Sequence, residues 1–97
     1  MISELKELEE AINSRTEDNE SLQHMSNRLY NNWEEMRKRW STIVLHEELD
    51  VIALSLISMK TNIRTGEYNR ALEQIDKSIF LLEDIVEKER VTIRNIL

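Results

Sequence analysis

The chain of 97 residues contains one glycine and no proline, and this limits its fold more than any other feature. An all-β protein reverses direction at hairpin turns, and those turns are usually built with such residues. Helices need neither residue in their interiors. We therefore expect an all-α protein, and the length suits a single domain.

The C-terminal half carries two apolar stripes with the spacing of amphipathic helices. Steps of three and four residues alternate along Leu45, Leu49, Ile52, Leu56, Met59 and Ile63. The same steps recur along Tyr68, Leu72, Ile75, Ile79, Leu82, Val86, Ile93 and Ile96, where only Glu89 breaks the series. Between the stripes lies Gly66, which can adopt the left-handed conformation that ends a helix. Such a short connection predicts an antiparallel hairpin.

The N-terminal half has one interrupted apolar frame, made of Leu5, Leu8, Ile12, Leu22, Leu29, Trp33, Met36, Trp40 and Ile43. Polar residues 13–19 interrupt it, and Ser14 with Glu17 matches a helix capping box, so we place a helix break there. A second break is expected near residue 41, where Ser41 and Thr42 can cap a new helix. A continuous, kinked helix is the alternative at that point.

These patterns predict an antiparallel helical bundle of two helical hairpins, residues 2–39 and 42–96, with three to four helices in a single domain 1–97. Residues 1–14 are expected to form a separate N-terminal helix or an oligomer contact. Their stripe of Leu5, Leu8 and Ile12 is set apart by the polar stretch that follows, and it is the predicted surface for a homo-oligomer.

Charge and hydropathy exclude several classes of partner. Thirteen basic and 19 acidic residues give a net charge of −6, which repels phosphate backbones, so no nucleic acid partner is expected. The longest mostly apolar run, 51–59, is far shorter than the roughly 20 residues of a membrane span. Without cysteine, disulfides and thiolate chemistry are also excluded.

The titratable residues show no grouping typical of an enzyme. His46 and Asp50, one helical turn apart, form half of a metal site at most, and Ser21 and Ile43 stand where a Glu-x-x-His motif would need glutamate. No glycine-rich turn offers a phosphate cradle or an oxyanion hole. We expect no catalytic residues, no cofactor and no metal, with a His46-based metal sensor as an alternative.

The densest apolar feature is aromatic, because Tyr30, Trp33 and Trp40 lie within eleven positions. One interpretation is a bundle core in which the indoles pack over Leu45, Leu49 and His46. The other is a partly exposed groove, made of Tyr30, Trp33, Trp40 and His46, that receives a partner helix, since tryptophan and tyrosine often anchor interfaces.

The segments Trp40–Asp50 and Asn95–Leu97, together with Trp33 and the helix start Tyr68–Leu72, resemble an uncharacterised bacterial family, domain of unknown function 4363. The resemblance covers about residues 17–97. It implies a helical domain outside the cytoplasm, attached to a cell-membrane anchor that is absent from this chain. The family has no established activity, so the resemblance does not indicate a reaction.

We therefore expect a non-enzymatic protein-interaction domain, the extracytoplasmic part of a membrane-anchored bacterial protein, that binds an unidentified protein or another copy of itself. Contact with a membrane is expected only through the absent anchor. The first alternative is a cytoplasmic export or assembly chaperone whose Trp33 and Trp40 groove shelters an amphipathic helix of its partner. The second alternative is the metal sensor built on His46 and Asp50.

Overall fold

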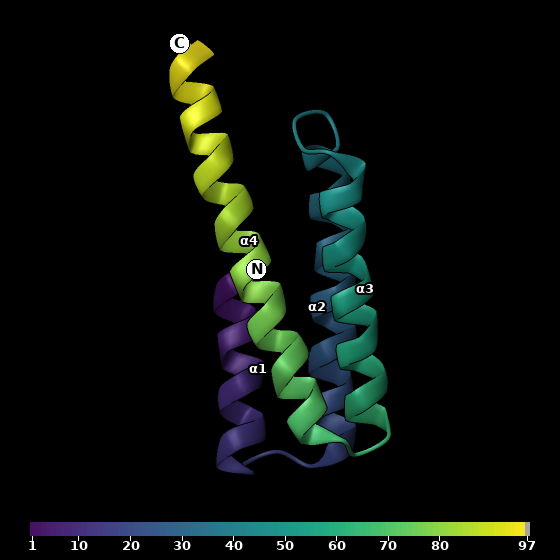
Figure 1. Ribbon diagram of the computed structural model, residues 1–97. Coiled ribbons are helices and arrows are strands. Elements are labelled where there is room, and N and C mark those ends of the chain that lie inside the picture. The colour runs from purple at the N-terminus through teal and green to yellow at the C-terminus, as the bar shows by residue number, and fades with distance from the viewer. Residues whose placement is uncertain (97) are drawn as a thin grey trace.

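The computed structural model describes the backbone of residues 1–96 and the side chains of residues 1–90. The backbone forms four helices and, within residues 1–96, no strand: α1 (Ile2–Ser14), α2 (Asn19–Trp40), α3 (His46–Arg64) and α4 (Tyr68–Ile96). Each helix runs antiparallel to the next, and α4 returns to pack against α1 (Figure 1). The predicted all-α antiparallel bundle is confirmed, with four helices.

The first connection lies where the sequence predicts it, but a different residue caps the new helix. Arg15 adopts a left-handed conformation, with φ of 55°, and ends α1. The Asp18 carboxylate then accepts a hydrogen bond of 2.8 Å from the Ser21 backbone N–H. The predicted capping box at Ser14 is wrong, because the Ser14 hydroxyl donates backwards to the Glu10 carbonyl oxygen at 2.7 Å.

The second break is also real, so the alternative of one continuous helix is wrong. Residues 41–45 form the connection between α2 and α3. Ser41 and Thr42 do not cap α3, because their hydroxyls donate to the carbonyls of Lys38 and Arg39 at the end of α2. Leu45 occupies the position before α3 and makes no side-chain capping bond.

At the third connection, Gly66 takes the predicted left-handed conformation, with φ of 75°. The Glu67 N–H donates to the Asn62 carbonyl at 2.8 Å and the Gly66 N–H donates to the Ile63 carbonyl at 3.1 Å, which is a Schellman ending for α3. Asn19 joins this turn to the start of α2, since its side-chain amide donates to the Ile63 carbonyl at 2.7 Å. Two connections at one end of the bundle are thereby tied together.

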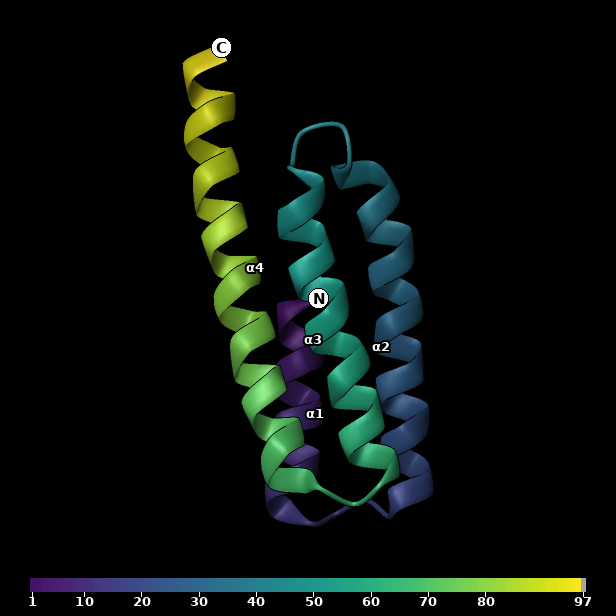
Figure 2. The same cartoon turned by 45° about the vertical axis from the view of Figure 1, so that its right-hand side comes forward.

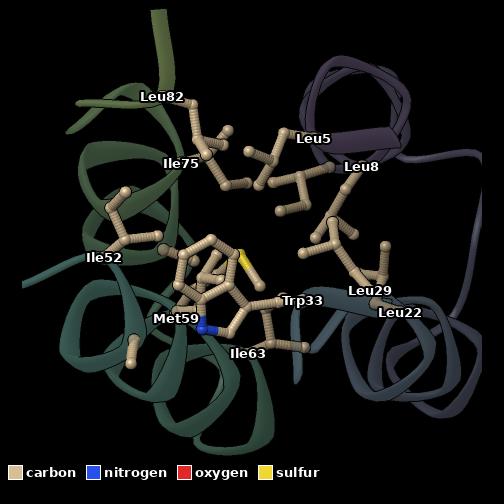
Figure 3. Packing of buried hydrophobic residues seen from close by; sticks show 14 of the residues in the cluster. Leu5, Leu8, Leu22, Leu29, Trp33, Ile52, Met59, Ile63, Ile75 and Leu82 are labelled. Atoms are coloured by element: carbon tan, nitrogen blue, oxygen red, sulfur yellow. The ribbon is translucent and has the colours of Figure 1, made fainter. Parts of the chain in front are cut away.

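The predicted stripes form one core, in which Trp33 is fully buried beside Met59 and Ile63 (Figure 3). Two stripe positions were assigned wrongly. Leu45 and Ile43 are 67% and 55% exposed, because both lie in the connection between α2 and α3, where the helical period no longer holds. Ile93 and Ile96 lie outside the residues whose side chains are described.

Helix α1 belongs to this core. Leu5 and Leu8 are fully buried and point toward α4 and α2, and Ile12 is buried as well (Figure 3). A separate N-terminal helix does form, as expected, but its stripe is not free for an oligomer contact, because the chain's own helices already cover all three side chains.

Helix α1 is much shorter than its neighbours. It has 13 residues, against 22 in α2 and 29 in α4. At 1.5 Å per residue, α1 spans about 20 Å and the adjacent α2 about 33 Å. The N-terminus therefore lies near mid-height of the bundle, and the end that holds the α2–α3 connection has only three helices (Figures 1 and 2).

Candidate functional site

An apolar groove lies between the end of α2 and the upper part of α4, in the half of the bundle that α1 does not reach. We call it the upper groove, and it is lined by Trp40, Ile43, Ile85, Val86, Glu89 and Arg90. Trp40 closes α2, Ile43 comes from the following connection, and the other four residues belong to α4. The groove thus joins residues that are more than 40 positions apart in sequence.

Exposure along the predicted stripe of α4 rises at the upper groove, although the neighbouring Ile85 is still buried. Leu82 and Val86 are successive members of the same core-facing stripe, yet Leu82 is 1% exposed and Val86 is 38% exposed. Ile2, the first residue of α1, lies beside Val86 in a neighbouring hollow, so this is the level at which α1 begins. The stripe of α4 therefore continues past its cover.

The rim of the groove carries charge, mostly on α4. Glu83 and Glu87 lie with Arg90 along the hollow that continues from the groove towards Ile2. Arg90 and Glu87 form an ion pair of 3.7 Å between exposed side chains, which contributes little to stability. The α4 rim thus presents more acidic than basic groups.

A charged clamp beside the groove holds α4 to the start of α3. Lys88 Nζ lies 2.9 Å from an Asp84 carboxylate oxygen and 3.2 Å from a Glu48 carboxylate oxygen. The carboxylates of Asp84 and Glu48 raise the pKa of the Lys88 ammonium above its ordinary value. These ion pairs join the start of α3 to the turn of α4 that carries Ile85 and Val86.

The structure does not bring the four predicted groove residues together. Trp33 is buried in the core, and His46 is exposed at the start of α3. Tyr30 faces α3, where the Lys60 ammonium lies 4.6 Å from the centre of its ring, and burial raises the pKa of its hydroxyl. Trp40 alone lines the upper groove.

The interpretation of the aromatic cluster as part of the core is only partly confirmed: Trp33 is buried in the core, but not all of its expected neighbours are. Leu49 is buried in the same core, as expected. Leu45 and His46 are exposed, so the indoles do not pack over them.

Sequence reasoning missed Ile85 and did not single out Val86 as a site residue. The signal was available in the helix lengths: a break at residues 13–19 leaves α1 too short to accompany α4 along its whole stripe. Counting turns would have placed Val86 beyond the reach of α1.

The two histidines are not drawn into a shared site. His24 lies 3.8 Å from Glu20 on the surface of α2, and His46 is exposed. Asp50, the proposed companion of His46, is paired with Arg37 of α2. Among the described side chains, residues 1–90, no three metal-ligating groups gather.

No helix in the described part of the chain combines the length and the apolar character of a membrane span. The chain matches no curated protein and no solved structure. One family model matches residues 1–96, which takes in α1 and so reaches beyond the segment 17–97 that carries the resemblance in sequence. The chain therefore belongs to the family described as Domain of unknown function (DUF4363).

Proposed function

We propose that this chain is a non-enzymatic protein-interaction domain whose upper groove docks an amphipathic helix of a partner protein. The exposure of Val86 on the core-facing stripe of α4 is the observation that carries the proposal. A side chain at that position would be covered in a bundle of four full-length helices. A helix that continues the line of α1 would cover this surface.

The length of the docked helix follows from the unequal lengths of α1 and α2. The difference of nine residues leaves about 13 Å of α2 without a neighbour on this side. A partner segment of about two and a half turns fills that space. It would run along the line of α1, between α2 and α4, with its apolar face towards Trp40 and Val86.

The charge of the rim adds a chemical preference. Glu83, Glu87 and Glu89 outnumber Arg90 on the α4 side of the groove and its extension. A partner helix with apolar residues at positions i, i+3 or i+4, and i+7, and with lysine or arginine on the flank facing α4, complements this surface. Such helix-in-groove recognition uses a few apolar anchors for affinity.

Location is a separate part of the proposal and is supported only by the family resemblance. We infer that the domain acts outside the cytoplasm as part of a membrane-anchored bacterial protein. The alternative, a cytoplasmic export or assembly chaperone, would use the same groove. Fractionation of cells that express the native gene separates the two: a membrane-associated, externally protease-accessible protein supports the first, and a cytoplasmic one supports the second.

The docking proposal is tested by selecting binders from a displayed library of short amphipathic helices. Binders should be recovered and should lose affinity by at least tenfold on Val86→Asp, which places a charge in the apolar groove. Leu54→Asp is the matched control, because Leu54 is an exposed apolar residue on α3, away from the groove. Failure to recover binders, or binders that tolerate Val86→Asp, would contradict the proposal.

A further inference from the structure

Helix α3 carries three exposed apolar residues on its outer side in addition to its buried core stripe. Val51, Leu54 and Ile57 are 41%, 64% and 44% exposed, and we call these three residues the α3 outer face. A helix at a protein surface normally turns polar residues to the solvent, and one that is apolar all round is normally covered on every side. Leu81 of α4 lies beside Val51 in an adjoining hollow and widens this apolar surface.

The α3 outer face is symmetrical about Leu54, because Val51 precedes it by three residues and Ile57 follows it by three. If a second copy of α3 packs against it in the antiparallel direction, Leu54 meets Leu54, and each Val51 lies at the same level along the helix axis as the partner's Ile57. One self-complementary patch on both copies is what a two-fold symmetric dimer requires.

Charges at the two ends of α3 favour the same direction. Glu47 lies about 10 Å from the level of Leu54 at one end, and Arg64 lies about 15 Å from it at the other. Both side chains are exposed, and neither has an ion pair within residues 1–90. In an antiparallel pair, Glu47 comes within about 5 Å, measured along the helix axis, of the partner's Arg64. A parallel pair would set like charges opposite each other instead.

We propose that two copies of this chain associate as an antiparallel, two-fold symmetric dimer through the α3 outer face. The proposal does not rest on the docking function, because α3 lies diagonally across the bundle from α1 and from the groove above it: α3 packs against α2 and α4, not α1 (Figure 3). Both upper grooves stay open in the dimer.

The first test is sedimentation equilibrium of the full chain over a range of concentrations. We expect a mass of twice the 11.6 kDa of one chain at high concentration. Leu54→Glu should weaken self-association by at least tenfold while circular dichroism stays helical, because it sets two carboxylates face to face at the symmetry axis. Val86→Glu, in the upper groove, is the matched control and should leave the association unchanged.

The second test reports geometry and uses the absence of cysteine in the chain. Leu54→Cys places a thiol on the proposed symmetry axis and should give a disulfide-linked dimer on mild oxidation. Phe80→Cys, at a slightly more exposed apolar position on α4, should stay monomeric on a denaturing gel. Glu47→Arg should weaken the dimer, and adding Arg64→Glu to it should restore the association.

The proposal is overturned if the chain sediments as a monomer at millimolar concentration, if its dimers are indifferent to Leu54→Glu, or if both cysteine variants cross-link equally. Binding of the monomer to neutral lipid vesicles, abolished by Leu54→Glu, would overturn it in favour of a membrane surface.

Discussion

Replacing Leu8 with alanine tests whether α1 is an integral part of the bundle. Leu8 is 0% exposed and packs between α2 and α4, so the substitution removes buried apolar atoms and leaves a cavity. Substitutions of this kind cost about 2–5 kcal/mol. Because α1 is a terminal helix that can shift towards the cavity, we expect a loss of about 3 kcal/mol, in the lower half of that range.

The loss is large against a total stability of about 5–15 kcal/mol for a domain of this size. It corresponds to a fall in Tm of about 12–24 °C, at about 4–8 °C per kcal/mol. Urea unfolding followed by circular dichroism measures it, and Leu45→Ala, an exposed leucine, is the control with an expected change within about 0.5 kcal/mol. A loss below about 1 kcal/mol for Leu8→Ala, or a separate early transition for α1, would refute the assignment of α1 to the core.

Three further substitutions test individual features. Ser78 is fully buried, and its hydroxyl has no hydrogen-bond partner in the described part of the chain. Ser78→Ala should therefore raise the free energy of unfolding by about 1 kcal/mol in urea titrations. A loss of stability would show that the hydroxyl does have a hydrogen-bond partner. A hydrogen bond with Asp76, followed by burial, raises the pKa of Glu9 above its ordinary 4.5. A carboxyl whose pKa is higher in the folded than in the unfolded protein stabilises the fold at pH values below its pKa in the unfolded protein. This stabilisation is lost as the pH rises through its pKa in the folded protein. Glu9→Gln should therefore stabilise the protein by a few tenths of a kcal/mol at pH 7 and have no effect near pH 4. Thermal melts at both pH values measure this, and equal effects at the two would contradict the pairing with Asp76. Gly66→Ala should lower the stability by about 1 kcal/mol in thermal melts. The cost comes from the backbone, whose φ of 75° disfavours a side chain, and not from a clash, because no atom lies within 4 Å of the added Cβ. An unchanged Tm would refute this.

The fold was largely predictable because periodic stripes report which face of each helix is buried. Within the described side chains, the turn at Gly66 and the stripe of α3 are confirmed, apart from Leu45. The stripe of α4 is buried or partly buried as far as Leu82, and Val86 is exposed. Periodicity fails where a helix ends, and Ile43 and Leu45 fall in such a connection. Capping was ambiguous for a related reason: several polar residues crowd residues 13–19, and only geometry selects Asp18.

The candidate site was less predictable than the fold. A stripe shows that Val86 faces inward, but the exposure of Val86 depends on how far α1 extends, which is a property of another helix. The sequence also grouped Trp33 with Trp40 because they are seven residues apart on one face of α2. One lies within the bundle and the other at its open end, so neighbours on a stripe have different surroundings.

Docking of a helix in the upper groove is the central claim, and fluorine NMR of protein labelled with 5-fluorotryptophan tests it most directly. The two tryptophans give two resonances, which Trp40→Phe assigns. When a helix selected for binding is added, we predict that the Trp40 resonance shifts and saturates at one helix per chain, while the resonance of the buried Trp33 stays in place. A bound helix that leaves the Trp40 resonance unchanged would contradict the account.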